Sequence, residues 1–348
     1  GVFTEKGVPL ERLFSQFQGK MNGFTKGRDR SFHFGTQKYH IIGMISHLGP
    51  QLGVADGIAL ADKLHKNDKI TVVFTGDGGT SEGDFHEALN VAAVWDLPVI
   101  FVIENNGYGL STPSSQQFRC KQFADKGKGY GMEAYTIDGN NVLEVYSAVK
   151  KLKQDISKNP KPIILECMTF RMRGHEEASG TKYIPKELMD AWAEKDPVEN
   201  YEQFLLSEKV MTTEEIEKIK SVLKKDIDVS WKKAESEENI VLNPKLELSD
   251  IYKEYHFTEI VKSDDSSEKR LVDAISDGLK QSFQRHDNLI IMGQDIAEYG
   301  GVFKVTDGFV KEFGENRIRN TPICESAIIS AALGLSINGY KSVMEMQF

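Results

Sequence analysis

Two largely apolar runs dominate the pattern of the first half of the chain, at residues 69–74 (KITVVF) and 99–104 (VIFVIE). Strands that are buried on both faces of a parallel sheet have this pattern. Between the runs, residues 81–95 place Phe85, Leu89, Ala92 and Ala93 on one helical face. The pattern therefore predicts a β-α-β unit whose two strands lie side by side in a parallel sheet.

The alternation of strand and helix continues to about residue 225. It predicts a helix at 142–156, a strand at 162–168, and a helix at 212–225 that opens with a capping signal and closes on lysines. Residues 226–267 lose this rhythm and are rich in Glu, Lys, Ser and Asp. That composition predicts a linker or a loosely packed connection.

A new alternation begins near residue 268, with a helix at 271–284 and a strand at 289–293. Residues 323–337 are apolar nearly all round and include many small residues, which predicts a buried helix at an interface. A strand at 342–348 follows, and we expect the chain to be part of a longer polypeptide. The predicted fold is α/β, with a parallel sheet flanked by helices in domain 1–225, a linker at 226–267, and the start of a second, similar domain at 268–348.

Charge and composition narrow the class of protein. The 43 Lys and Arg against 52 Asp and Glu give a net charge of −9, which argues against a nucleic-acid partner. The apolar fraction of 40% and charged fraction of 27% are typical of soluble proteins, and no apolar run approaches the length of a membrane span. Three scattered cysteines and the lack of a signal-peptide pattern favour a cytoplasmic, bacterial location.

Polar residues follow both strands of the predicted β-α-β unit. Gly76-Asp77-Gly78-Gly79 comes after the first strand, and Asn105-Asn106-Gly107-Tyr108 comes after the second. The carboxyl ends of adjacent parallel strands share one crevice, so we expect Asp77 and Asn106 to meet there. A carboxylate repels a diphosphate directly, but it can hold the Mg²⁺ that binds one. An amide oxygen and a backbone carbonyl near Tyr108 could complete the ligand set.

Three other readings of the glycine-rich stretch are weaker. A Gly-Asp-Gly after a strand is often only a turn. A Walker A loop is excluded because no Gly-Lys-Ser/Thr follows. A dinucleotide fingerprint fails at its third glycine, where Ser81 stands, although Glu104 occupies the place of a ribose-binding acid.

The stretch GDG, 26 residues and then NN resembles the thiamine diphosphate and magnesium motif. The surrounding GDGGTSEGDFHEAL, LSTPSSQQF, GYGMEAYTIDGNNV and LECMTFRMRGH are similar to the α subunit of 2-oxo acid dehydrogenase E1 components, most of all the branched-chain type. Further on, NLIIMGQDIAEYGG and RIRNTPICESAIISAALGL resemble the start of the E1 β subunit. The resemblance implies a fused α and β chain with a thiamine diphosphate-binding fold. The implied function is oxidative decarboxylation of a 2-oxoisovalerate-like acid and reductive acylation of lipoylated E2.

The same resemblance assigns roles to individual residues. It implies that Asp77, Asn106 and the Tyr108 carbonyl bind Mg²⁺ and that Gly78 and Gly79 approach the diphosphate. It implies cofactor contacts for Ser46 and Leu48, and a place for His175 near the diphosphate and the substrate carboxylate. From the residues alone, the Ser46 and Leu48 stretch would be only a strand-to-helix loop, and a lone histidine such as His175 is more often structural.

Glu325 is the most consequential assignment. It matches the β-subunit glutamate that hydrogen-bonds N1′ of the thiamine aminopyrimidine, while from the sequence alone it could simply cap a helix. Its neighbours are apolar on both sides, so we expect Glu325 to be buried, which favours the protonated form able to donate to N1′.

The sequence also departs from the family pattern. Glu176 stands where animal mitochondrial homologues carry a phosphorylated serine, so we do not expect that control. Ile45, His47 and Pro50 replace residues of a potassium site, so the resemblance does not imply one. We expect a homodimer or an α2β2-like assembly, and we do not expect this piece alone to be catalytically competent. A pyruvate or acetoin dehydrogenase E1, and a non-catalytic module that docks E2, stay open as alternatives.

Overall fold

The computed structural model describes residues 1–29, 31–43, 47–176, 178, 180–252, 254–259, 261 and 264–347. The chain divides into two compact units. Residues 47–204 and 269–348 form one, which we call the sheet unit, and residues 1–46 and 205–268 form the other, which we call the helical unit.

Strands and helices alternate through the sheet unit. Its longer strands are β1 (Thr71–Gly76), β2 (Val99–Asn105), β5 (Glu133–Asp138), β6 (Ile163–Met168), β7 (Leu289–Gly293), β8 (Ile318–Asn320) and β9 (Lys341–Met344), and β3 (Tyr108–Gly109) pairs with β4 (Thr112–Pro113) in a short hairpin. Its helices are α3 (Pro50–Leu64), α4 (Gly83–Val94), α5 (Ser114–Gln117), α6 (Gly127–Tyr130), α7 (Val142–Lys158), α8 (Lys186–Ala193), α12 (Leu271–Arg285), α13 (Phe309–Phe313) and α14 (Glu325–Ile337), with α9 (Pro197–Ser207) at the boundary. Two 3-10 helices, η2 (Gly78–Ser81) and η3 (Phe123–Lys126), complete the set.

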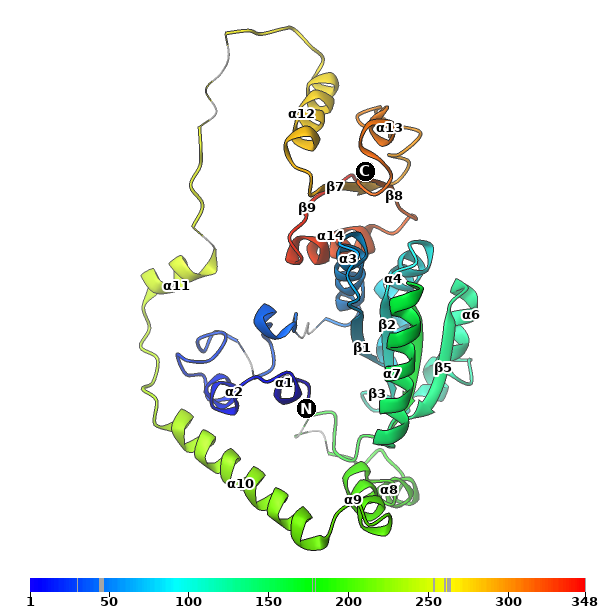
Figure 1. The fold of residues 1–348 in the computed structure, drawn as a ribbon, viewed down its shortest axis with the longest axis vertical. Helices are drawn as coiled ribbons and strands as arrows, with labels where there is room; N and C mark the ends of the chain where they lie inside the picture. Colours follow the sequence, from blue (N-terminus) through cyan, green and yellow to red (C-terminus); the bar gives the residue numbers. More distant parts are fainter. Residues whose placement is uncertain are drawn as a thin grey trace. The chain divides into compact units, whose positions relative to one another are not determined.

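The first sheet has the strand order β1-β2-β6-β5, and all three pairings are parallel. Helices α3 and α4 pack on the face that carries Phe101 and Ile103, and α7 packs on the face that carries Ile100 and Val102 (Figure 1). Strand β2 is covered on both faces, which explains its continuous apolar run. The predicted β-α-β unit is therefore confirmed, with β1 and β2 adjacent.

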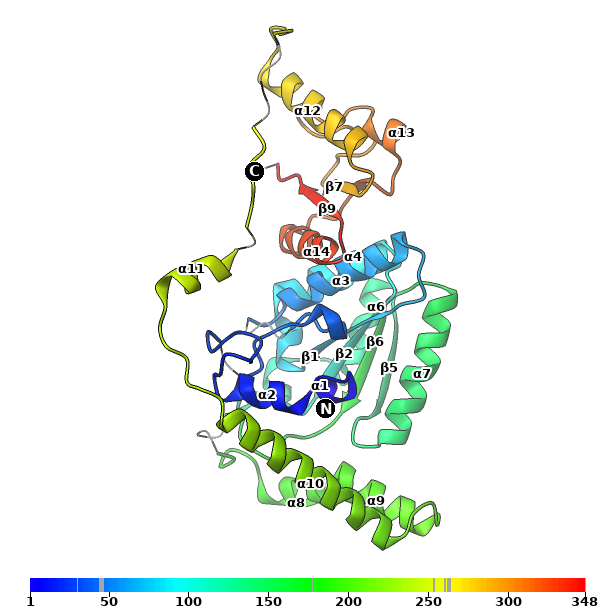
Figure 2. The same cartoon turned by 60° about the vertical axis from the view of Figure 1, so that its left-hand side comes forward.

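The second sheet has the order β8-β7-β9, again parallel. Helix α14 covers one of its faces and also packs against α3 (Figure 2). The two helices approach so closely that a Cβ added at Gly57 would stand 2.0 Å from the Ala331 carbonyl oxygen, and one at Gly334 would stand 2.1 Å from that of Val54. The small residues of 323–337 thus serve the interface that the sequence predicted.

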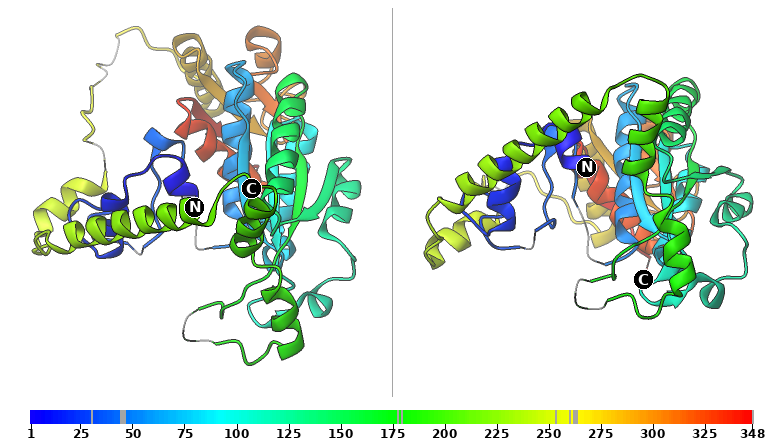
Figure 3. Two further views of the ribbon diagram at one scale, coloured as in Figure 1. Left: turned by 60° about the horizontal axis from the view of Figure 1, so that its bottom comes forward. Right: turned by 90° about the horizontal axis from the view of Figure 1, so that it is seen from below.

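The helical unit contains α1 (Val2–Glu5), α2 (Leu10–Phe17), α10 (Thr213–Glu235) and α11 (Pro244–Ile251), together with the 3-10 helix η1 (Gln37–Tyr39). Helix α10 runs beside α2 (Figure 3). The ring of Phe14 meets that of Trp231 edge-on at 5.4 Å, and Ser15 Oγ donates to Glu237 Oε1 at 2.5 Å. The N-terminal segment is thereby joined to α10 and to residues of the predicted linker in one unit.

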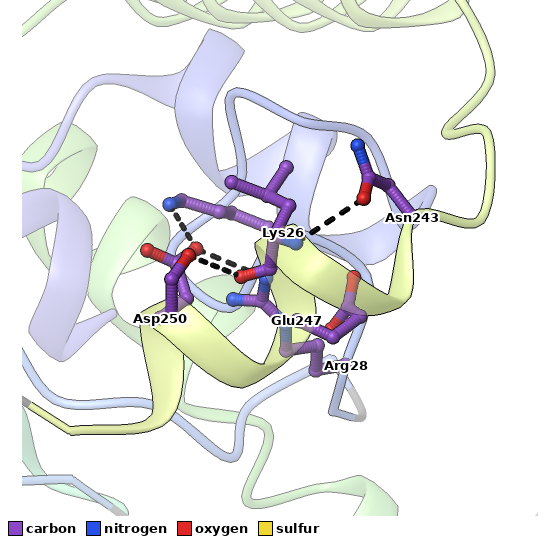
Figure 4. Close-up of polar contacts among 7 residues, drawn as sticks. Lys26, Arg28, Asn243, Glu247 and Asp250 are labelled. Atoms are coloured by element: carbon purple, nitrogen blue, oxygen red, sulfur yellow. Dashed lines mark hydrogen bonds and ion pairs between the residues drawn. The ribbon is translucent and has the colours of Figure 1, made fainter.

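The predicted linker is more ordered than its composition suggested. The capping box of Thr212 and Glu215 is present, but α10 continues ten residues past the predicted end, to Glu235. Further on, α11 is held to the N-terminal segment by ion pairs of Lys26 and Arg28 with Glu247 and Asp250, including Arg28 Nη2 to Asp250 Oδ2 at 2.9 Å (Figure 4). Strong helix formers, Lys and Glu among them, explain why a polar stretch folds here.

One strand was not predicted, and the bounds of another need correction. Strand β5 lies at the edge of the first sheet with alternating, partly exposed residues, and the sequence reading did not find it. Strand β9 ends at Met344, earlier than predicted.

Within the ranges described above, no helix has both the length and the apolar character to cross a membrane.

Candidate functional site

Asp77 follows β1 directly and is 1% exposed. Its carboxylate oxygen Oδ2 accepts a hydrogen bond from Ser114 Oγ at 2.5 Å, and its backbone carbonyl accepts from Thr80 Oγ1 at 2.9 Å. Among the described residues, none forms an ion pair with Asp77. Burying a carboxylate is costly unless a cation compensates it, so this position is suited to binding one.

The loop that follows β2 begins at the same edge of the sheet as the loop that follows β1. Gly76 of β1 is paired with Glu104 of β2, so both strands end at the same edge of the sheet. Beyond that edge, Asn106 Oδ1 accepts a hydrogen bond from the Tyr108 amide at 3.1 Å, and Gly107 has a φ of +80°. This tight turn keeps the Asn106 side chain close to its own backbone, with a second lone pair on Oδ1 still available.

Ser114 joins the two loops. Its amide donates to the Gly107 carbonyl at 2.8 Å while its hydroxyl donates to Asp77. In addition, a Cβ at Gly78 would stand 3.0 Å from the Cα of Gly109, so the loops are in near contact. The structure thus places the loop of Asp77 and Gly78 beside the loop that follows β2. The sequence reading missed Ser114, although a hydroxyl shortly after the Asn-Asn pair was a usable signal.

Gly79 lies where a side chain would not fit. A Cβ there would be 2.4 Å from Thr75 Oγ1 and 4.0 Å from the Cβ of Leu48, which shows that Leu48 is next to the Asp77 loop. The side chain of Leu48 is 53% exposed. It can therefore offer an apolar surface to a ligand in this loop. The other residue predicted in that stretch, Ser46, lies outside the described residues.

Arg171 and Tyr183 link His175 to the loop that follows β2. Arg171 Nη1 lies 3.0 Å from His175 Nδ1, Arg171 Nη2 donates to the Leu110 carbonyl at 2.6 Å and to the Tyr183 hydroxyl at 3.2 Å, and the Tyr183 ring meets that of Tyr108 at 5.6 Å. Since Arg171 only donates, Nδ1 of His175 accepts and the proton of the neutral imidazole is on Nε2. The sequence reading missed Arg171, which precedes His175 by four residues.

Glu325 is the first residue of α14, and its side chain is exposed. Gln294 Nε2 donates to its Oε1 at 3.1 Å. The prediction that Glu325 is buried was wrong for this chain, because only Cys324, Ala327 and Ile328 turn toward the core at this end of the helix. The alternative of a helix-start role is borne out in position, since Glu325 lies in the first turn of α14, where a carboxylate suits the helix dipole. It forms no side-chain cap, and the Ala327 amide instead donates to Glu87 Oε2 of α4 at 3.0 Å.

The donor set fits a hard cation. It comprises a carboxylate from Asp77, an amide oxygen from Asn106 and a backbone carbonyl at Tyr108, and Mg²⁺ prefers such oxygen ligands. Within the described ranges, no group of three or more His, Cys, Asp or Glu could hold a metal ion, so nothing there competes as a zinc-type centre. Gly78 and Gly79 follow Asp77 directly, and neither has a side chain to cover the backbone amides there.

The chain is similar to known proteins along most of its length. Residues 1–242 match the family model described as "Dehydrogenase E1 component", and residues 268–348 match that of the "Transketolase, pyrimidine binding domain". The chain is 35% identical over 72% of its length to 2-oxoisovalerate dehydrogenase subunit alpha 1 of Arabidopsis thaliana, and 34% identical over 73% to the mouse subunit alpha. It is 36% identical over 60% to the alpha subunit of an acetoin:2,6-dichlorophenolindophenol oxidoreductase of Bacillus subtilis. It spans 53%, 58% and 63% of the lengths of these relatives.

Proposed function

Because this chain belongs to the dehydrogenase E1 component family, we propose that it acts in the decarboxylation of a 2-oxo acid with thiamine diphosphate and Mg²⁺. The observation that carries the proposal is the buried carboxylate of Asp77, which accepts a hydrogen bond from Ser114 at the shared edge of β1 and β2. We further propose a branched-chain, 2-oxoisovalerate-like substrate, supported by the names of the Arabidopsis and mouse relatives.

The residues of the two loops divide the work of binding. Asp77, Asn106 and the carbonyl of Tyr108 would hold Mg²⁺, and Gly78 and Gly79 would let the diphosphate approach the backbone. Leu48 would give an apolar contact beside Gly79. When bound, thiamine diphosphate supplies the electron sink that a 2-oxo acid needs in order to lose CO₂.

Two titratable side chains would handle protons and charge. His175 is oriented by Arg171 so that its Nε2–H is left to donate, which suits a group that binds a phosphate or carboxylate oxygen. Glu325 would hydrogen-bond the aminopyrimidine. Its exposure in this chain means that further protein or the cofactor itself would have to cover it.

We also propose that the α-like and β-like parts of an E1 component are fused here. Two family models that match consecutive stretches of one chain support this, and so does the packing of α14 on α3 within the sheet unit. The proposed assembly is a homodimer or an α2β2-like complex, and the proposed partner is a lipoylated E2 acyltransferase. A bacterial cytoplasmic location is in keeping with the three free cysteines.

The test of the cofactor proposal is a titration of the full-length polypeptide with thiamine diphosphate, with Mg²⁺ and with EDTA. We expect saturable binding that requires Mg²⁺. Equal binding with EDTA would contradict the metal assignment, and no binding in either buffer would favour the non-catalytic E2-docking module.

The test of the substrate proposal is a panel of acids on the same polypeptide. Reduction of an artificial electron acceptor should be fastest with 3-methyl-2-oxobutanoate and slower with pyruvate. Acetoin is included because the B. subtilis relative is named for it. A preference for acetoin or pyruvate would reject the branched-chain proposal while leaving the cofactor site intact.

A further inference from the structure

Lys126 forms a hydrogen bond with η2, the 3-10 helix that follows Asp77. Its Nζ donates a hydrogen bond to the backbone carbonyl of Thr80 at 2.8 Å. Thr80 belongs to η2, the turn that follows Asp77, and its own amide donates back to the Asp77 carbonyl at 3.1 Å. Lys126 therefore determines how the peptide plane after Thr80 is oriented.

Three aromatic rings surround the Lys126 ammonium group. It lies 4.7 Å from the ring centre of Phe118, 5.2 Å from that of Phe85 and 5.8 Å from that of Phe123. These distances are within the range of cation–π attraction. Burial among the rings lowers the pKa of Lys126, so the fold bears a cost for keeping an ammonium group here. A methionine would fill the same space without that cost, but it would lose both the attraction to the rings and the bond to Thr80.

Glu166 binds the start of the loop that follows β2. It is 0% exposed on β6 and accepts three hydrogen bonds: from Asn105 Nδ2 at 2.7 Å, from the Ala124 amide at 3.0 Å and from Thr136 Oγ1 at 3.0 Å. Asn105 in turn accepts from the Gly107 amide at 3.1 Å. The orientation of the Asn105 amide, and with it the start of the turn through Asn106, therefore depends on Glu166.

Both contacts converge on one short segment, η3. Its second residue, Ala124, is bonded to Glu166, and its last residue, Lys126, is bonded to Thr80. We propose that η3 is a brace that holds the Asp77 and Asn106 loops in the geometry needed for the metal and diphosphate, with Lys126 and Glu166 as its positioning residues. The inference rests on the proposed function for what is bound, whereas the brace itself concerns only this chain.

The decisive variant is Lys126→Met, compared with Lys128→Met. Lys128 is a matched control because it lies two residues away and its side chain is 84% exposed. Among the described residues it forms an ion pair with Asp125 alone, at 3.3 Å. The first readout is amide hydrogen exchange of the peptide that contains residues 77–83, without any ligand. The second is the Mg²⁺-dependent dissociation constant for thiamine diphosphate in the full-length polypeptide, with thermal unfolding recorded alongside.

We expect Lys126→Met to speed exchange in residues 77–83 at least tenfold and to weaken cofactor binding at least tenfold, while the protein still unfolds in one cooperative thermal transition. Lys128→Met should match the wild type in all three. Unchanged exchange and affinity in Lys126→Met would overturn the brace. Faster exchange in a protein whose wild type binds no cofactor would keep the brace and reject the proposed function instead.

A second variant, Glu166→Gln, tests the other end of the brace. A glutamine that faces Ala124 and Thr136 with its oxygen presents its NH₂ group to Asn105, which must then turn its own amide over. That rotation removes the acceptor of the Gly107 amide. We expect weaker cofactor binding and a changed amide resonance for Gly107, and an unperturbed Gly107 resonance with full affinity would contradict the role of Glu166.

Discussion

Ser114 and Asp77 are linked by a hydrogen bond of 2.5 Å between hydroxyl and carboxylate, across 37 positions of sequence. Ser114 also donates its amide to the carbonyl of Gly107, so one residue joins the loop after β1 to the loop after β2. The Asp77 carboxylate thus has a fixed orientation before any cation arrives. A group held in place in advance loses less freedom on binding.

Replacing Ser114 by alanine removes only the hydroxyl half of this link. We expect Mg²⁺-dependent cofactor affinity to fall up to about tenfold, since one hydrogen bond to a buried group contributes roughly 0.5–1.5 kcal/mol. The measurement is calorimetric titration of the full-length protein, with the exposed neighbour Ser115→Ala as control. Identical affinities for both variants would show that the hydroxyl does not order Asp77.

Glu325→Gln should separate binding from chemistry. The amide keeps the size of the side chain and can still accept from Gln294, but it cannot exchange a proton with a ligand. We expect thiamine diphosphate affinity to change little, while the decarboxylation rate falls at least a hundredfold, the lower bound for loss of a general acid or base. A variant with wild-type turnover would reject the proton-handling role.

The crossing of α3 and α14 is sensitive to single methyl groups. Gly57→Ala would place a Cβ 2.0 Å from the Ala331 carbonyl oxygen. Because this is a backbone atom of α14, it can move away only if the helix shifts. We expect the free energy of unfolding to fall by about 1–3 kcal/mol, as for other overpacked cores. Gly278→Ala in α12 is the control, since nothing lies within 4 Å of the added atom and a helical Gly→Ala change stabilises by up to about 1 kcal/mol. Urea unfolding that ranks the two variants the other way would contradict this packing.

Asp56 should make stability depend on pH. It is 0% exposed in α3, neither carboxylate oxygen has a hydrogen-bond partner among the described residues, and burial raises its pKa well above the ordinary value. From the unfolded-state pKa near 3.9 up to the raised folded-state pKa, the native chain keeps a proton that the unfolded chain has lost. The free energy of unfolding therefore falls with rising pH in that window, by up to about 1.4 kcal/mol per pH unit.

Asp56→Asn abolishes that titration. The difference in unfolding free energy between this variant and the wild type should grow in favour of the variant as the pH is raised from 5 to 8. Urea titrations at four pH values measure it, and a difference that stays constant with pH would show that Asp56 is ionised at no cost.

The sequence was most informative where one strand or one loop determines the outcome. Strands β1 and β2 were predictable because burial on two faces leaves a continuous apolar run, and Asp77 and Asn106 because parallel strands end together. Strand β5 was missed because its residues are partly exposed and form no continuous apolar run, and α10 was cut short because its charged residues resemble those of a linker. The exposure of Glu325 depends on which side of α14 turns inward at its first residue, which apolar neighbours do not reveal.

The two proposed positioning residues, Glu166 and Lys126, could not be found from the sequence. Glu166 and Lys126 lie 61 and 46 positions from the groups that they hold, and only the folded sheet brings them there. Nothing in their local sequence distinguishes them from a buried strand residue and a surface lysine.

We propose that Asp77 marks a metal-dependent thiamine diphosphate site. The most direct test of this proposal is calorimetric titration of thiamine diphosphate with Mg²⁺ into full-length wild-type protein and the Asp77→Ala variant, each with a confirmed native melting profile. We predict saturable, Mg²⁺-dependent binding to the wild type and none to Asp77→Ala. Equal affinity in the two proteins would contradict the assignment of Asp77 to the metal and cofactor site.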